Sequence, residues 1–187
     1  VLESGIDALA CPAWKWLWGP LGLGFLWMKP EFMNKIQPVF VGADGVAHPE
    51  ELLAYNLTPR EDMRRFEYAT KNYGDIITLN ASLSLTLELG ITSIQSRLFK
   101  LVDEYRKATH EAGAVLHGDY PPDNRSGIFS CTIPGKNLET IRHHLATDGI
   151  LTSIRDGRLR ISPHVYHDSS DIQRWQDGLT RAMAKAE

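Results

Sequence analysis

The sequence has few of the features that mark secreted, metal-binding or disulfide-rich proteins. Among 187 residues there are two cysteines, Cys11 and Cys131, which lie far apart and show no metal-ligand spacing. No secretory signal accompanies them, and thiols outside the secretory pathway are normally reduced. We therefore expect free thiols, no metal and a cytoplasmic protein.

Neither sign of charge dominates the chain, and no long apolar run is present. The formal net charge is −3, without a basic excess or a charged tail, so we expect no nucleic-acid partner. Apolar stretches are interrupted before the roughly 18 residues that a membrane-spanning helix needs, so no membrane span is expected. A hydrophobic content of 43% suffices for one domain, or for a small domain with part of another.

Lys15 is the most informative residue. It follows an apolar stretch, residues 6–11, and stands among Trp14, Trp16 and Trp18. Removing an ammonium group from water favours the neutral amine, which is the nucleophile of a Schiff-base lysine. The alternative is a lysine whose stem crosses aromatic surface with its head in water. The local pattern alone favours this alternative.

Hydrophobic periodicity divides the first two thirds of the chain into three kinds of segment. Residues 6–11 and 21–28 show little alternation, which predicts strands buried on both faces of an α/β sheet. Residues 30–75 are irregular, and so long an irregular stretch is usually functional. Apolar residues then recur at helical spacing over 76–87 and 91–108, which predicts two helices.

The last third, residues 114–187, predicts a small α+β unit. Its expected elements are a strand over 126–133, a helix capped by Asn137, a strand over 150–154, and a last helix capped by Ser169 or Ser170.

Asp156-Gly157 is a strong two-residue hairpin signal, so a returning strand is expected after it. Because side chains alternate along a strand, Arg158 and Arg160 share one face, and Leu159 lies on the other.

Four separated blocks resemble the class V aminotransferase family, which are fold-type-I enzymes dependent on pyridoxal phosphate (PLP). The blocks are K-W-L-W-G-P-L-G-L-G-F-L over residues 15–26, R-F-E-Y-A-T-K-N over 65–72, residues 79–91, and R-L-R-I-S-P-H-V-Y over 158–166. They keep the family's order but match only the C-terminal half of such an enzyme. Since residue 1 is Val, we expect a fragment of a longer protein.

The resemblance implies a fold and a domain organisation. Residues 1–75 would form the end of the PLP-binding large domain, with a mixed, mostly parallel sheet. Residues 76–187 would form connecting helices and a small C-terminal α+β domain. The full-length protein would be a homodimer.

The resemblance also implies roles for three residues. Lys15 would form the Schiff base with PLP and then carry the proton at the substrate Cα. The hydroxyl of Thr70 would contact the phosphate of the neighbouring subunit's PLP. Arg160, in the family's R-x-S motif, would bind the α-carboxylate of an amino acid substrate, and Arg158 competes for this role.

The sequence departs from the family before the lysine. Many relatives carry a Ser-Gly-His or similar triplet there, whose serine binds the cofactor phosphate, whereas this chain has Pro12-Ala13-Trp14. Proline offers neither a hydroxyl nor an N–H, so phosphate binding must depend on other groups. Arg65 and Asn72, near Thr70, are weaker candidates.

A cysteine desulfurase of this superfamily uses a mobile-loop cysteine shortly before the carboxylate-binding arginine. Here that interval is the tight turn at residues 155–157, which holds no thiol. Cys131 lies on a predicted strand, where a small buried hydrophobic residue is the expected role. The sequence therefore favours other PLP-dependent reactions over that of a cysteine desulfurase.

The resulting hypothesis is the C-terminal part of a PLP-dependent enzyme that acts on an amino acid, with transamination ahead of epimerisation or a lyase reaction. The alternative, from another class, is a catalytically incomplete fragment or a binding or structural remnant. Relatives supply the ring-stacking residue and the carboxylate facing the pyridinium nitrogen from the half that is missing here. We therefore expect this fragment alone to be inactive. In a complete enzyme, we expect the Lys15 amine to lie in a cleft.

Overall fold

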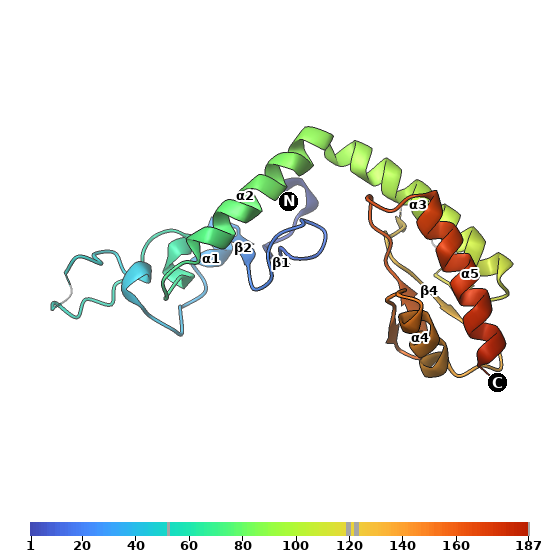
Figure 1. Ribbon diagram of the computed structural model, residues 1–187. Coiled ribbons are helices and arrows are strands. Elements are labelled where there is room, and N and C mark those ends of the chain that lie inside the picture. The colour runs from blue at the N-terminus through green and yellow to red at the C-terminus, as the bar shows by residue number, and fades with distance from the viewer. Residues whose placement is uncertain (52, 119–120, 122–123, 187) are drawn as a thin grey trace. The chain divides into compact units, whose positions relative to one another are not determined.

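A computed structural model describes residues 1–51, 53–118, 121 and 124–186. These residues form two compact units, Val1–Glu88 and Leu89–Glu187 (Figure 1). The domain boundary predicted after residue 75 falls within the first turn of α2 (Tyr73–Leu89) and stays a prediction. In the described part of the chain no single helix is long and apolar enough to cross a membrane; α2 and α3 (Ile91–Glu111) meet that test only as a bent pair.

The N-terminal unit contains a two-stranded antiparallel sheet of β1 (Ala8–Pro12) and β2 (Gly24–Met28). Both predicted strands are therefore present. The predicted burial on both faces is wrong for this chain, because Phe25 and Leu26, which point to opposite faces, are each 42% exposed. Each strand pairs with one neighbour among the described residues, and no parallel pair occurs there.

The predicted irregular stretch after β2 contains only short helices. The helices of this unit besides α2 are η1 (Leu2–Ser4), α1 (Pro30–Met33), η2 (Ala43–Gly45) and η3 (Met63–Phe66). Close backbone approach joins this stretch, since a Cβ on Gly42 would lie 1.9 Å from the carbonyl oxygen of Tyr68. The Lys71 ammonium adds ion pairs to Asp44 at 3.3 Å and Glu67 at 3.1 Å.

The C-terminal unit packs three helices on one face of a four-stranded antiparallel sheet. The elements are α3 (Ile91–Glu111), β3 (Val115–His117), β4 (Phe129–Thr132), α4 (Leu138–Thr147), β5 (Ser153–Arg155), β6 (Arg158–Ile161) and α5 (Ser169–Lys185). The strand order is β3-β4-β6-β5, and α5 lies beside α3 (Figure 1). Leu101, Leu145, Leu159 and Leu179 are fully buried in the core. The predicted α+β unit is confirmed.

Helix capping follows the prediction in one case and not in the other. Asn137 caps α4, accepting hydrogen bonds from the N–H groups of Glu139 and Thr140. The predicted serine cap of α5 is wrong: Asp168 occupies the N-cap and forms a capping box with Asp171. The Ser170 hydroxyl and backbone N–H both donate to the Asp168 carboxylate and lower its pKa, so the charged acceptor is favoured at this position.

The buried hydrogen bond between α3 and α5 provides a test of this packing. The indole N–H of Trp175 donates to the Thr109 hydroxyl at 2.8 Å, and Trp175 is 3% exposed. Thr109→Val leaves that donor without a partner, so we expect the C-terminal unit to lose about 1–3 kcal/mol of stability. Hydrogen exchange at amides of β4 and β6 measures the loss.

The matched control is Thr180→Val, because the exposed Thr180 hydroxyl donates only to the carbonyl oxygen of Gln176 on the same helix. We expect this control to change stability by less than about 0.5 kcal/mol. Equal effects of the two variants would contradict the role of the buried bond.

Candidate active site

Lys15 lies on a tight loop that joins β1 to β2. The Ala13 N–H donates to the Leu23 carbonyl at 2.9 Å, and the Gly19 N–H donates to the Ala13 carbonyl at 2.9 Å. Trp18 takes a left-handed conformation with φ of 54°. The loop is therefore closed at its base by backbone hydrogen bonds, with Lys15 near its tip.

Helix α2 fixes the far side of this loop. The Ser82 hydroxyl donates to the carbonyl oxygen of Trp18 at 3.1 Å. A Cβ on Gly19 would come within 2.7 Å of Ala13 Cβ and 2.9 Å of Leu79, so a larger residue does not fit there. The glycine after the lysine is thus explained by close packing against Ala13 and α2.

The Lys15 side chain is exposed, and its Nζ lies 5.0 Å from the centre of the Trp14 ring. Among the described residues it has no ion-pair partner. The Trp14 ring attracts the charged form of this group, and because the side chain is exposed a cofactor can reach it. The cleft predicted around this amine concerns the complete enzyme and stays a prediction.

Thr70 lies on the exposed segment between η3 and α2. Its neighbours Ala69 and Lys71 line an apolar groove together with Leu23 and Phe25 of the loop and strand β2. The Lys71 ion pairs fix this segment, and the pKa of Lys71 is raised chiefly because its ammonium donates to the Glu67 carboxylate. The structure thus places the Thr70 segment at the same end of β2 that closes the Lys15 loop.

Two weaker candidates near Thr70 differ in their surroundings. Asn72 is a helix cap, since its side-chain oxygen accepts from the Asp75 N–H and its amide donates to the Asp75 carboxylate. Arg65 retains a buried Nε that has no hydrogen-bond partner among the described atoms. Pro12, at the end of β1, adds no donor, as the sequence predicted.

Arg160 lies in the C-terminal unit, on the sheet face opposite the helices. Its register partners are Ser130 on β4 and Ser153 on β5, and Ser130 pairs in turn with His117 on β3. These four side chains form a polar row across the sheet, because paired residues share a face. The Nε of Arg160 is buried without a hydrogen-bond partner in the described structure.

Arg160 is one of three arginines that line a cavity of about 330 Å³, together with Arg155 and Arg158. His117 and Ser130 line it as well. The sequence predicts that Arg158 shares this face, but it misses Arg155, His117 and Ser130. Their positions depend on strand pairing, which the sequence alone does not give.

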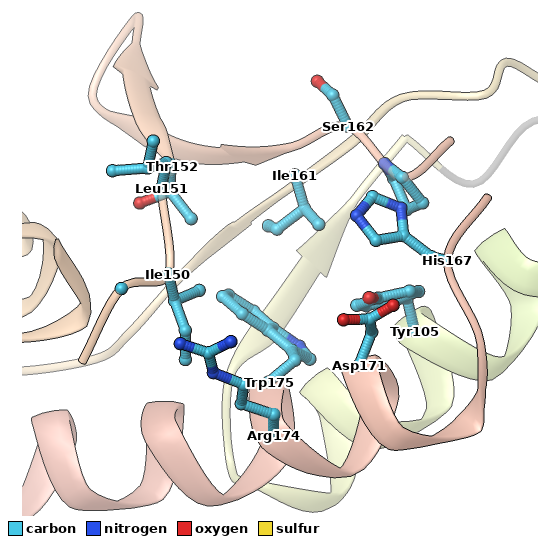
Figure 2. A pocket seen from close by; sticks show the side chains of 12 residues that line it. Tyr105, Ile150, Leu151, Thr152, Ile161, Ser162, His167, Asp171, Arg174 and Trp175 are labelled. Atoms are coloured by element: carbon cyan, nitrogen blue, oxygen red, sulfur yellow. The ribbon is translucent and has the colours of Figure 1, made fainter. Parts of the chain in front are cut away.

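A second cavity, of about 150 Å³, lies on the helix side of the same strand. Figure 2 shows Ile161 pointing toward Trp175, with Tyr105 and Asp171 beside it. Burial, together with the Asp171 and Asp168 carboxylates, raises the pKa of Tyr105 to about 12. Strand β6 therefore separates a helix-covered cavity, lined by apolar groups together with Asp171 and Arg174, from a face with three arginines.

Two residues near this strand, His164 and Cys131, are buried. His164 is buried, 8% exposed, and stacks on Tyr166 with ring centres 4.7 Å apart, whereas Tyr166 is itself 71% exposed. Cys131 is fully buried on β4, as predicted, and burial raises the pKa of its thiol to about 12. A thiol with that pKa is protonated at neutral pH and is a poor nucleophile.

Comparison with known proteins places the whole chain in one group. The family described as aminotransferase class-V matches residues 1–174. A "Probable cysteine desulfurase" of Pyrococcus abyssi is 28% identical over 96% of this chain, and an "Uncharacterized aminotransferase" of Schizosaccharomyces pombe is 28% identical over 98%. The chain spans 47% of the length of each of these relatives.

Solved structures share the fold. A cysteine desulfurase of Escherichia coli is similar over 100% of this chain and 48% of its own, with a TM-score of 0.84 and 22% identity. A mutant of the protein C-DES, with glycine covalently linked to its PLP cofactor, gives a TM-score of 0.86 at 21% identity over 96% of this chain and 47% of its own. These likenesses confirm the predicted α/β fold of a PLP-dependent transferase.

The burial of Cys131 predicts its reactivity. In the native chain we expect iodoacetamide at pH 8 to modify the partly exposed Cys11 and to leave Cys131 unmodified, because burial keeps the Cys131 thiol protonated. Mass spectrometry of peptides after timed alkylation measures both sites. Denaturation in urea should remove the difference, and rapid native labelling of Cys131 would contradict the assignment.

Proposed function

The chain belongs to the class V aminotransferase family, and we propose that it is the C-terminal part of a PLP-dependent enzyme that acts on an amino acid, with transamination as the leading reaction. The observation that carries the proposal is the Lys15 amine, held on a loop closed by backbone hydrogen bonds and free of any carboxylate partner among the described residues. The solved C-DES structure, in which glycine is covalently linked to the PLP cofactor, supports the same cofactor here.

The residues present fit PLP and its amino acid substrate in three of the four expected positions. The Lys15 amine is accessible to the cofactor's aldehyde, and the exposed Thr70 hydroxyl is available to a phosphate oxygen. The unpartnered Nε of Arg160 fits a carboxylate, as a guanidinium binds one in a planar, bidentate manner. Pro12 does not fit, since it has no donor for the phosphate.

PLP would supply an electron sink for the bond broken at the substrate Cα. Lys15 would hold the cofactor covalently, and after substrate exchange its freed amine would remove and return the Cα proton. Arg160 would bind the α-carboxylate and thereby fix the orientation of the substrate. In the proposed homodimer, Thr70 would serve the phosphate of the partner subunit's cofactor.

The relatives named as desulfurases raise a second candidate, which two observations disfavour. The turn at Asp156 and Gly157, with φ of 49° and 68°, directly joins β5 to β6 and holds no cysteine. Cys131 is buried and protonated. Transamination, epimerisation and elimination need a proton carrier but no thiol, so Lys15 suffices for them.

The alternative from another class is a catalytically incomplete chain or a binding or structural remnant. The chain spans about half the length of its relatives, so activity belongs to a full-length protein that supplies the remaining cofactor contacts. A cytoplasmic location remains part of this proposal.

Lys15→Ala in the full-length protein tests the cofactor role. We expect the variant to lose the visible absorbance that PLP gives when bound to a lysine, because the loop between β1 and β2 holds no second lysine that could replace Lys15. Borohydride reduction followed by peptide mass spectrometry should locate the modified residue at Lys15. The control is Lys35→Ala, at an exposed position of the same unit. Unchanged absorbance in Lys15→Ala would contradict the proposal.

Arg160→Ala tests the carboxylate role. Losing a hydrogen bond to a charged group costs about 1.5–3 kcal/mol, and about 1.4 kcal/mol is tenfold in rate. We therefore expect kcat/KM for α-amino acids to fall at least tenfold, with a much smaller change for the corresponding decarboxylated amines. The cofactor spectrum should be unchanged. An equal loss of kcat/KM for α-amino acids and for their decarboxylated amines would show that Arg160 does not bind the carboxylate.

A further inference from the structure

The residues that line the cavity around Arg160 provide more positive charge than is needed to bind one carboxylate. Arg155, Arg158 and Arg160 line it, and Asp156 is the one carboxylate-bearing residue among its lining residues. The cavity measures about 330 Å³, which is room for a small organic acid. An excess of cation in a concave site concentrates anions there.

These arginines differ from the others of the C-terminal unit in their bonding. Among the described residues the side chains of Arg158 and Arg160 have no hydrogen-bond or ion-pair partner, and the Arg155 guanidinium donates only to the adjacent carbonyl of Ile154. The other arginines of this unit each donate to a carboxylate or to a carbonyl distant in sequence: Arg97, Arg106, Arg125, Arg142, Arg174 and Arg181. The unsatisfied guanidinium groups are therefore gathered at this cavity.

The hairpin also places two of these charges in an unfavourable position. Arg155 and Arg158 are direct register partners at the turn. Like charges opposite each other in an antiparallel pair destabilise the sheet. Such a local conflict is expected where function requires it, because a bound anion would offset the repulsion.

The spacing of the arginines suits two anionic groups on one molecule. Arg158 and Arg160 are alternate residues on β6, so their Cα atoms lie about 7 Å apart on the same face at roughly 3.4 Å per residue. One guanidinium can then bind an α-carboxylate while its neighbour binds a second anion a few bonds away.

We propose that Arg158, together with Arg155, forms a second anion subsite beside Arg160, and that the substrate is an amino acid whose side chain ends in an anionic group. The proposal rests on the proposed function, in that Arg160 is taken to bind the α-carboxylate. The anionic group on the side chain is either a carboxylate or a phosphate, and the experiments below distinguish these two groups.

Binding of glutarate and butyrate to the cofactor-free full-length protein, measured by calorimetry, tests the subsite without requiring Lys15. We expect glutarate to bind at least tenfold more tightly than butyrate. Arg158→Gln should remove this preference and leave butyrate unchanged, whereas Arg160→Gln should weaken both ligands. The matched control is Arg142→Gln, which removes a surface arginine paired with Glu139 and should change neither ligand.

Turnover by the loaded enzyme gives a second readout. Glutamate should exceed norvaline, its uncharged analogue of equal length, in kcat/KM by at least tenfold, and Arg158→Gln should abolish that ratio while Arg158→Lys retains part of it. A preference for O-phosphoserine over glutamate would keep the second subsite and assign it to phosphate. Equal binding of glutarate and butyrate, or an equal loss of both in Arg158→Gln, would overturn the subsite even if Lys15 holds the cofactor.

Discussion

The alternation of side chains along β6 is the constraint on which the C-terminal unit and its part of the candidate site depend. Leu159 is fully buried against the helices, and Ile161 is 6% exposed. Between them Arg160 must point to the opposite face, because successive residues of a strand do. Burying a leucine stabilises a fold by about 1.5–3 kcal/mol, so a one-residue slip in register would be strongly unfavourable. The core thereby fixes which face the arginines occupy.

The loop around Lys15 is fixed in a different way. This loop is exposed or half-buried over most of its length. Its shape is determined by backbone hydrogen bonds to Leu23 and within the loop. Contact with α2, through Ser82 and Leu79, holds its far side. The Lys15 amine is thus carried by a short, constrained loop, which limits the number of positions it can take relative to β2.

Features that depend on neighbouring residues are predicted well from the sequence, whereas features that depend on contacts between distant segments are predicted less well. The Asp156-Gly157 turn, the Asn137 cap and the burial of Cys131 each depend on a few neighbouring residues, and all three are confirmed. The cap of α5 was mispredicted because Asp168, Ser169 and Ser170 stand in a row and each can accept a helix N–H. Burial of both faces of β1 and β2 was predicted because their residues are apolar. Their actual exposure depends on which other elements cover them, and the sequence pattern does not give this. Arg155 joins the candidate site only through its pairing with Arg158, which no local pattern specifies.

The kind of anion bound at the second subsite would decide between the reactions that Lys15 permits. A side-chain carboxylate is bonded through carbon and cannot leave with the bonding electron pair, so removal of the Cα proton leads to transamination or to return of the proton. A phosphate ester on the β-carbon can leave with its electron pair, so the same proton removal permits elimination. Arg158 and Arg155 would then bind a spectator group in the first case and a leaving group in the second. In either case the chemistry needs no thiol, which agrees with a hairpin that places arginines where a desulfurase needs a cysteine.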